Sequence, residues 1–205
     1  MSDHQLSDGY KQTEIGVIPD NWDVVPLGSY VDINSGESPS KFDLIDQGTP
    51  YFKVEQLDND SKYLKTTSYY FRGGEAVPEG SLIFPKGGVS ILLNKVRILA
   101  QDSFVDTNLM TLTTFNELEV EYLYYYLEYA GLSKVADTNS IPQINNKHIV
   151  PFLIPFPPLE EQRAIVQALS DVDAEITALE NCCAKTQAIK QGMIQELLTG
   201  KTRLV

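Results

Sequence analysis

The strongest pattern in the chain is a run of apolar residues at helical spacing from Leu159 to Leu198. From Ile165 to Thr186 these residues recur at alternating steps of four and three, which is the spacing of the a/d seam of a coiled coil. After an extra three-residue step, a stammer, the seam continues toward Leu197. The predicted seam consists of Ile165, Leu169, Val172, Ile176, Leu179, Cys183, Ile189, Met193 and Leu197.

Two interpretations of this run remain open. No proline interrupts it, and at about 1.5 Å per residue the helix would be about 60 Å long. It is either an amphipathic helix packed on its own domain or one strand of a coiled coil, and its length and narrow stripe favour the coiled coil. Because the chain shows only one long helix, we expect the partner to be another copy of the chain. The mixed charges of the polar faces do not indicate the partner's direction.

Upstream of Pro158 the pattern changes to short apolar runs separated by Gly- and Pro-containing turns, which is typical of strands. Ser29–Ile33 is read as a helical turn or a further strand, and Glu119–Ala130 as a short helix closed by Gly131. The predicted strands are 23–26, 51–54, 69–71, 82–84, 91–93, 96–100, 109–114 and 149–154.

These patterns predict an α+β fold, with a mainly-β domain carrying short helices and then one long C-terminal coiled-coil helix. The segment Pro155-Phe-Pro-Pro158 marks the boundary, because proline fixes φ and disfavours helix before it. The expected organisation is a flexible leader over residues 1–12, a globular domain over 13–158, the long helix over 159–198 and a tail over 199–205.

Five tyrosines surround the short helix, namely Tyr122, Tyr124, Tyr125, Tyr126 and Tyr129. They either pack in the core and against neighbours or form a stacking platform for nucleic-acid bases. Packing is the favoured interpretation, because aromatic clusters on helices are usually buried. Leu123, Tyr126, Leu127 and Ala130 are expected to form the buried stripe.

The net charge of -12 limits the kinds of partner that fit the chain. Residues 1–158 hold 11 Lys and Arg against 21 Asp and Glu. This argues against non-specific nucleic-acid binding, which relies on a basic excess. Contact with DNA would need basic residues gathered on one face, or a basic partner subunit. Since the chain shows neither a bilayer-length apolar run nor a signal peptide, we expect a cytoplasmic protein.

The inventory of catalytic side chains is thin. The only histidines are His4 and His148, which leaves little for a histidine-based triad or a zinc cluster. No glycine pattern of a phosphate loop or dinucleotide site follows a predicted strand. Cys182 and Cys183 are adjacent on the helix, cannot bridge each other there and are expected to stay reduced. The sequence therefore predicts a protein that is not an enzyme by itself and binds no cofactor.

Two polar stretches are candidates for DNA contact. Lys and Arg bind phosphates, and Arg, Asn and Gln pair with guanine and adenine edges, so such side chains on loops suit readout in the major groove. For any single residue a solvated surface position is the commoner role, and only the ensemble argues for DNA. The candidates are Lys53, Lys62, Lys65, Arg72, Lys86, Lys95 and Arg97, with Gln143, Asn145, Asn146 and Lys147 in a second stretch that also takes in residues 138–140.

Four motifs resemble the specificity (S) subunits of type I restriction-modification systems. They are an opening motif, Thr13-Glu-Ile-Gly-Val-Ile-Pro-Asp-Asn-Trp22 with Pro26-Leu-Gly28; a strand start, Glu79-Gly-Ser-Leu-Ile83, in which Ser81 replaces the usual Asp; a Gln-centred loop, Ser140-Ile-Pro-Gln-Ile-Asn145; and a closing motif, Ile154-Pro-Phe-Pro-Pro-Leu-Glu-Glu-Gln-Arg-Ala-Ile165 with the ending Leu197-Leu-Thr-Gly-Lys-Thr-Arg-Leu204. The closing motif is the most specific.

The resemblance implies a target recognition domain that reads one half of a split double-stranded DNA site, followed by a helical spacer. It also implies docking to methyltransferase (M) subunits, which supply the S-adenosylmethionine chemistry, and through them to a restriction (R) subunit. Members of the family carry two such halves in one chain, whereas one is visible here. We therefore expect a homodimer with antiparallel helices and a palindromic, interrupted target. The alternative is a regulatory or decoy protein that occupies methyltransferase subunits without reading DNA.

Overall fold

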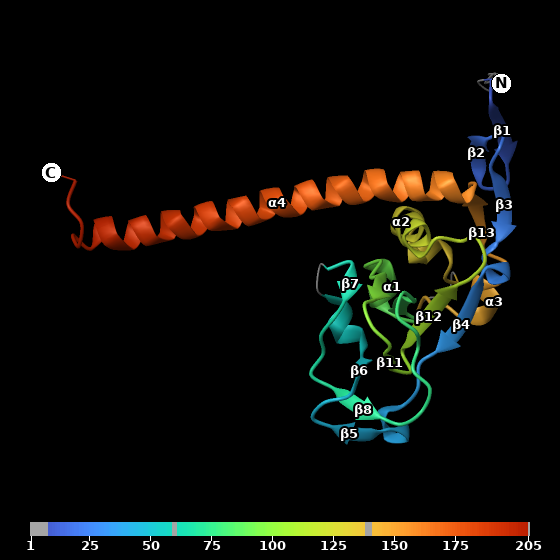
Figure 1. The fold of residues 1–205 in the computed structure, drawn as a ribbon, viewed down its shortest axis with the longest axis horizontal. Coiled ribbons are helices and arrows are strands. Elements are labelled where there is room, and N and C mark those ends of the chain that lie inside the picture. Colours follow the sequence, from blue (N-terminus) through green and yellow to red (C-terminus); the bar gives the residue numbers. More distant parts are fainter. Residues whose placement is uncertain (1–7, 59–60, 138–140, 205) are drawn as a thin grey trace. The chain divides into compact units, whose positions relative to one another are not determined.

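The computed structural model describes residues 8–58, 61–137 and 141–204. They divide into two compact units, one that ends at Arg163 and one that begins at Ala164 (Figure 1). The first unit holds every strand and the three short α-helices, and the second is formed by most of the long helix. The mixed α+β architecture with a long C-terminal helix confirms the predicted fold class.

The larger sheet has five strands in the order β4-β12-β9-β10-β7. Its inner strand β12 pairs antiparallel with both β4 and β9. At the other edge β7 runs parallel to β10, a pairing between segments far apart in the sequence. The strands are β4 (Val31–Ser35), β7 (Tyr63–Leu64), β9 (Leu82–Pro85), β10 (Arg97–Leu99) and β12 (Leu109–Thr114).

The second sheet has four strands in the order β11-β6-β8-β5. It combines a parallel pair, β11 with β6, and antiparallel pairs of β8 with β6 and β5. The two sheets bury apolar clusters, one around Phe52, Ile83 and Leu99 and one of Tyr51, Phe71 and Phe104. The strands are β5 (Asp43–Ile45), β6 (Thr49–Phe52), β8 (Tyr70–Arg72) and β11 (Phe104–Val105).

Two small sheets organise the start and the end of the globular unit. β1 (Tyr10–Thr13) and β2 (Gly16–Pro19) form an antiparallel hairpin. β3 (Asp23–Pro26) pairs antiparallel with β13 (Leu153–Phe156). The pairing of β3 and β13 brings the opening motif beside the closing motif.

Glycines allow the chain to pack closely at two points. Leu27 and Gly28 donate backbone hydrogen bonds to Phe152 and Val150, and a Cβ on Gly28 would lie 2.7 Å from the Val150 Cα. A Cβ on Gly36, just after β4, would collide with the carbonyl of Asp106. Both positions therefore require the absence of a side chain.

The short helices are α1 (Val89–Leu92), α2 (Val120–Ala130) and α3 (Asn146–Ile149), and the 3-10 turns are Leu27–Ser29, Pro39–Lys41, Val54–Asp58 and Leu132–Lys134. Helix α2 ends at Gly131, which adopts φ 81°, as its C-cap position predicts. Its buried residues are Tyr122, Leu123, Tyr124, Leu127 and Ala130. Packing is thus the main role of the tyrosine cluster, although Tyr126 is only half-buried and Tyr129 is 84% exposed.

Helix α4 (Leu159–Leu198) has the bounds expected from the sequence. Its first turn is anchored by Gln162, whose side chain is fully buried. Gln162 Oε1 accepts from the Glu119 backbone N–H at 2.9 Å, and Nε2 donates to the carbonyls of Glu117 and Pro157, each at 2.9 Å. These bonds explain why the first compact unit extends to Arg163 rather than ending at Pro158.

Three local assignments from the sequence are wrong. Residues 91–93 were expected as a strand, but Gly88 at φ 76° starts the helical turn α1 instead. The strand expected from Ile149 begins only at Leu153, because Ile149 ends α3. The flexible leader expected over residues 1–12 should not include residues 10–12, since Tyr10–Thr13 pair with β2; residues 1–7 lie outside the described residues.

Candidate nucleic-acid interface

Two loops that are far apart in the sequence meet beside β9 and form one polar surface, which we call the loop pair (residues 85–88 and 141–147). The Ile144 backbone N–H donates to the Lys86 carbonyl at 2.8 Å, and the Gly88 N–H donates to the Pro142 carbonyl at 3.1 Å. Gly87 and Gln143 form an isolated antiparallel bridge between these bonds. The pairing holds the first polar stretch, at Lys86, directly against the second, at Gln143.

The loop pair presents amide and ammonium side chains toward solvent. Gln143, Asn145, Asn146 and Lys147 are exposed, and Lys86 is half-buried. The Gln143 backbone is fixed from both sides, because its N–H donates to Asp137 Oδ1 at 3.0 Å and its carbonyl accepts from the Asp137 N–H at 3.1 Å. Donor and acceptor groups on such a rigid backbone suit the reading of base edges.

The start of α3 is stabilised by the side chain of His148. His148 Nδ1 accepts a hydrogen bond from the Asn145 backbone N–H at 3.2 Å, which closes the first turn of the helix. The sequence predicted only that His148 was too isolated for catalysis. Its position shows that it orders the segment that carries Asn145, Asn146 and Lys147.

Two of the predicted DNA contacts are already engaged within the protein. Lys62 Nζ lies 2.9 Å from Glu121 Oε2 and 3.2 Å from the Tyr125 hydroxyl. Burial alone would lower the pKa of Lys62, but the hydrogen bonds to Glu121 and Tyr125 outweigh it and leave the pKa raised. Lys95 forms an ion pair with Asp58. These charges are therefore largely compensated before any phosphate approaches.

The remaining basic candidates are distributed over both sheets. Lys53 Nζ stands 3.6 Å above the ring of Tyr69, and Arg97 Nη1 donates to the Val96 carbonyl at 2.6 Å. The side chain of Lys65 is exposed. Arg72 is exposed on β8, where it faces Asp43 across the strand pair. Among the predicted basic residues, Lys86 is joined to the second polar stretch by the backbone hydrogen bond from Ile144.

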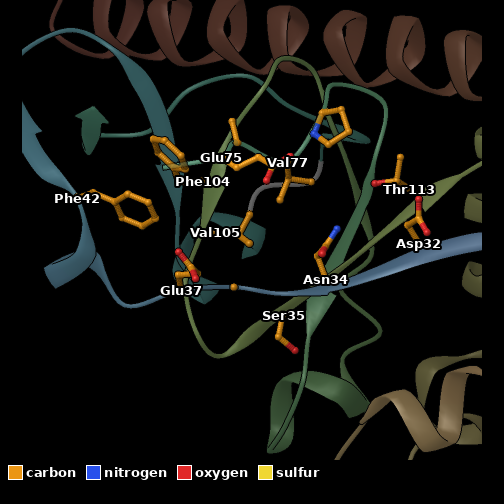
Figure 2. Close-up of a pocket in the computed structure, with 13 residues that line it drawn as sticks. Asp32, Asn34, Ser35, Glu37, Phe42, Glu75, Val77, Phe104, Val105 and Thr113 are labelled. Carbon is orange, nitrogen blue, oxygen red and sulfur yellow. The ribbon is translucent and has the colours of Figure 1, made fainter. Parts of the chain in front are cut away.

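A cleft of about 540 Å³ lies between β4, β11 and the segment 75–78 (Figure 2). Its charged lining residues are acidic, in contrast to the lysines of the loop pair. Asp32, Glu37 and Glu75 line it together with the aromatic rings of Phe42 and Phe104. Carboxylates repel phosphate, so this face does not suit the DNA backbone. The cleft could not be predicted from the sequence, because Glu75 is far along the chain from Asp32 and Glu37 and no pattern links them.

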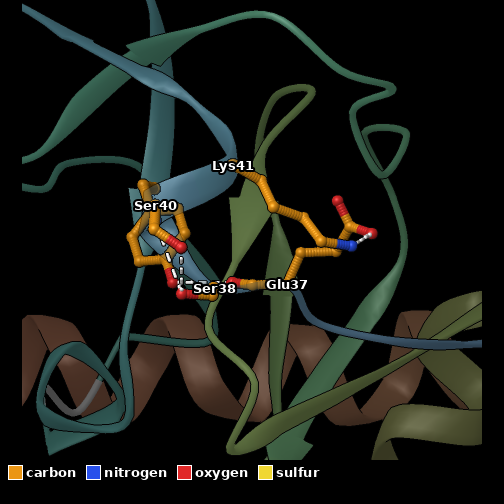
Figure 3. A network of polar contacts seen from close by, with 5 residues as sticks. Glu37, Ser38, Ser40 and Lys41 are labelled. Carbon is orange, nitrogen blue, oxygen red and sulfur yellow. Dashed lines mark hydrogen bonds and ion pairs between the residues drawn. The ribbon is translucent and has the colours of Figure 1, made fainter.

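The rim of this cleft is held by short-range polar contacts (Figure 3). Lys41 Nζ pairs with Glu37 Oε1 at 2.7 Å, and the hydroxyls of Ser38 and Ser40 lie 2.9 Å apart. Behind the rim, the Tyr51 hydroxyl donates to the Glu37 carbonyl at 2.9 Å and to Asp106 Oδ2 at 3.1 Å. Burial and the neighbouring Asp106 carboxylate raise the pKa of Tyr51, so this hydroxyl stays a donor.

The predicted seam of α4 is exposed within the second unit. Val172 is 53% exposed, Ile176 48% and Leu179 63%. Near the end of the helix the apolar face widens into a groove of about 420 Å³ lined by Thr186, Ile189, Lys190, Met193, Ile194, Leu197 and Leu198. An exposed apolar stripe of this kind is a surface for another helix.

Residues 8–58, 61–137 and 141–204 contain neither a cluster of metal ligands nor a helix that could span a membrane. No group of three or more His, Cys, Asp or Glu side chains gathers there as a metal site. Within the same residues no helix combines the length and hydropathy needed to cross a bilayer.

Comparison with known proteins gives this geometry its context. The family described as the type I restriction modification DNA specificity domain matches residues 19–191. The chain belongs to this family. The match begins at the last residue of β2 and ends within α4, so this specificity domain includes the five-stranded sheet, the four-stranded sheet, the β3–β13 pair and most of the long helix.

Two curated relatives of this specificity domain come from Methanocaldococcus jannaschii. The type I restriction enzyme MjaVIII specificity subunit is 26% identical over 95% of this chain and 49% of the relative. The putative type I restriction enzyme MjaX specificity subunit is 27% identical over 95% of this chain and 47% of the relative. The chain thus spans about half the length of the curated relatives it matches.

Solved structures share the fold of this specificity domain. One of them comes from a study described as the structural basis underlying complex assembly and conformational transition of the type I R-M system. It superposes with a TM-score of 0.71 at 26% identity, and the match covers 87% of this chain and 46% of the other chain. The HsdS subunit from Thermoanaerobacter tengcongensis superposes with a TM-score of 0.67 at 24% identity, covering 92% and 47%.

The family motifs now have structural explanations in this chain. Ser81, which replaces the usual Asp of the strand-start motif, is buried and bonds to the Pro78 carbonyl and the Thr113 hydroxyl, each at 2.8 Å. The Gln-centred loop forms half of the loop pair, except for Ser140, which with residues 138 and 139 lies outside the described residues. The Gln of the closing motif is the buried Gln162.

Proposed function

We propose that this chain is a DNA-specificity subunit of a type I restriction-modification complex, which reads one half of a bipartite DNA site. Two copies act together through antiparallel pairing of their α4 helices, and each copy docks a methyltransferase subunit. Methylation and cleavage reside in the partner subunits, and the chain itself supplies target choice.

The observation that carries this proposal is the loop pair. It joins a lysine, a glutamine and two asparagines on a hydrogen-bonded backbone in a chain that belongs to a DNA-specificity family. Asn and Gln pair bidentately with adenine, and Lys with guanine, so the surface carries the side chains needed for direct readout. By contrast, Lys62 and Lys95 are proposed to contribute mainly to the stability of the domain.

The exposed seam of α4 supports the dimer. Its large apolar residues have no cover within the second unit, and a second helix would bury them. Two identical recognition domains related by a two-fold axis would read identical half-sites, with the helices setting the spacing between them. The net charge of -12 fits this arrangement only if a partner subunit brings much of the positive surface.

The test is to co-express the chain with the modification subunit of its own system and to map the methylated adenines in the host genome. We expect a palindromic motif interrupted by a fixed gap. The matched control is the same complex with Lys86→Glu, which should lose the motif while the subunits still assemble. An asymmetric split motif would contradict the homodimer, because it requires two different recognition domains.

A second candidate function is favoured by the acidic net charge and the acidic cleft. It is a regulatory or decoy protein that occupies methyltransferase subunits without reading DNA. A stable complex with the modification subunit that methylates no site and whose DNA binding ignores sequence would support the decoy. Sequence-specific binding that weakens steeply as salt rises would exclude it.

A further inference from the structure

We propose that two α4 helices pair in one specific antiparallel register, with the two-fold axis passing beside Asn181, and that Lys190 selects this register. The inference rests on the homodimer put forward as the proposed function and extends it to named residue layers. Three observations carry it, namely the spacing of the seam, the distribution of charge along the helix and the shape of the apolar groove.

The spacing of the seam is the same from either end. Steps of four and three continue without interruption from Ile165 to Leu197 if the position after Thr186 is Lys190 rather than Ile189. The strict heptad therefore needs no stammer. In this series each seam residue before Asn181 has a counterpart equally far after it. An antiparallel pair centred there forms complete layers of Ile165 with Leu197, Leu169 with Met193, Val172 with Lys190, Ile176 with Thr186, and Leu179 with Cys183.

The charges of α4 are separated along its length. Residues 164–181 carry Asp171, Asp173, Glu175 and Glu180 and no Lys or Arg, whereas residues 182–198 carry Lys185 and Lys190 against one carboxylate, Glu196. A parallel pair would place acidic halves together and would bring Lys190 against its own copy in the seam. An antiparallel pair places the acidic half of each helix along the basic half of the other, which is favourable.

Lys190 distinguishes between antiparallel registers. Opposite it lies Val172 of the second copy, which is flanked in sequence by Asp171 and Asp173. A lysine stem can pack along an apolar neighbour while its ammonium group reaches carboxylates at the edge of the seam. A shift by one heptad places Lys190 opposite Ile165 or Leu179 instead and leaves seam residues at the helix ends without a partner. The register centred on Asn181 is the one in which the residue opposite Lys190 has an acidic residue on both sides, whereas Leu179 has one, Glu180, and Ile165 has none.

The groove has the form expected for receiving knobs from this register. A hole in a coiled coil is lined by four residues of one helix. The groove residues supply two such holes, one formed by Thr186, Ile189, Lys190 and Met193 and the next by Lys190, Met193, Ile194 and Leu197. In the proposed register the residues opposite these holes are Val172 and Leu169 of the second copy.

The register is tested by thiol crosslinking of the full chain after Cys182 and Cys183 are both replaced by serine. The variant Leu169→Cys with Met193→Cys is treated with a short bismaleimide crosslinker. We expect covalent dimers from this double variant and from an equimolar mixture of the two single variants, but not from either single variant alone. Crosslinking of Leu169→Cys by itself would overturn the register in favour of parallel helices. Crosslinking of Leu169→Cys with Thr186→Cys, but not with Met193→Cys, would indicate a shift by one heptad and also overturn it.

Light scattering before crosslinking separates this inference from the proposed function. A chain that is monomeric in solution would contradict the homodimer itself, whereas a dimer that gives the wrong crosslinks would contradict the register alone.

As a second readout, Lys190→Glu should weaken dimerisation by roughly tenfold or more, since it brings a carboxylate between Asp171 and Asp173 of the second copy. The control is Lys201→Glu, which has the same charge change beyond the end of α4 and should leave dimerisation nearly unchanged. Equal effects of the two variants would contradict the role of Lys190.

Discussion

Gln162 shows how one buried amide can fix the beginning of a long helix. Its side chain makes three hydrogen bonds, and two of them reach the segment before α2 rather than neighbours in its own helix. A buried amide is favourable only when its donors and acceptor are all used, as they are here. A carboxamide is required at this position, because a carboxylate could not donate to the carbonyls of Glu117 and Pro157.

Replacement of Gln162 by alanine should lower the free energy of unfolding by about 2–4 kcal/mol, since it leaves backbone groups unsatisfied and opens a cavity. Urea denaturation of the purified chain measures the change. The matched control is Gln167→Ala on the exposed face of the same helix, which should shift stability by less than about 0.5 kcal/mol. Similar losses for both variants would show that the anchoring bonds are unimportant.

Buried tyrosines predict a loss of stability at alkaline pH. Burial raises the pKa of the Tyr122 hydroxyl, which donates to the Pro155 carbonyl at 3.0 Å. A raised pKa means that the folded state holds the proton more tightly, so this stabilisation is complete below the ordinary value of 10.0 and is lost as pH rises above it. Lys62, whose pKa is also raised, acts in the same direction.

We therefore expect Tm to be nearly constant from about pH 8 to 9.5 and to fall above about pH 10, because a tyrosine that unfolding brings into water ionises there while the folded state still holds the proton. Tyr122→Phe should be less stable at neutral pH by about 1 kcal/mol and should lose less stability between neutral and alkaline pH than the unmodified chain. Thermal unfolding across this pH range gives the comparison. Parallel curves for the two proteins would refute the role of Tyr122.

Among the secondary-structure elements, the end of β4 depends on a glycine. Gly36→Ala should destabilise the globular unit by about 1–3 kcal/mol, because the new methyl group would displace the backbone at Asp106. Gly192→Ala is the control, since that glycine lies in α4 with open space around its Cα. The control should stabilise the helix by up to about 1 kcal/mol. Denaturation curves that move in the same direction for both would contradict the close packing at Gly36.

Elements with a strong local signal could be predicted from the sequence. The bounds of α4 follow from helical periodicity between Pro158 and Gly200, and the end of α2 follows from Gly131. The run at Ile91 was misassigned, because a few apolar residues fit a strand or a helical turn and only Gly88 distinguishes them. The parallel pairs β7 with β10 and β6 with β11 join distant segments, which no local pattern indicates.

The same limit applies to the candidate interface. Residue type identified Lys86 and Gln143, but their proximity depends on the pairing of two loops that are separated in the sequence by α1, β10, β11, β12 and α2. Residue type also selected Lys62 and Lys95, whose acidic partners Glu121 and Asp58 come from other segments. A basic residue in a sequence gives its charge, whereas the fold decides whether that charge is available.

For the whole molecule, DNA reading and dimerisation should be separable. Lys86→Glu should weaken specific DNA binding by more than about tenfold and reduce its salt dependence, while the mass of the particle in light scattering stays unchanged. Arg72→Glu, the same charge change on β8, should have a smaller effect on target choice. If Arg72→Glu were the more damaging, the reading face would lie on the four-stranded sheet rather than on the loop pair.

The complementary variant, Ile176→Asp with Leu179→Asp, should abolish dimerisation and leave the unfolding of the globular unit unchanged, because both residues belong to the exposed seam. Light scattering and circular dichroism measure the two properties. The control is Thr177→Asp with Ala178→Asp, which places the same charges beside the seam. Loss of the globular unit's cooperative unfolding in the seam variant would contradict the separation of the two units.

The pairing of β3 with β13 has a consequence for how such chains can diversify. Residues 23–26 and 153–156 lie on adjacent strands, so the polypeptide enters and leaves the body of the sheets at one place. A recombination event with crossovers in these two strands would exchange everything between them as a closed cassette. The long helix, with the register proposed for it, would be inherited intact, and under the proposed function a lineage would gain a new DNA target without having to evolve a new assembly.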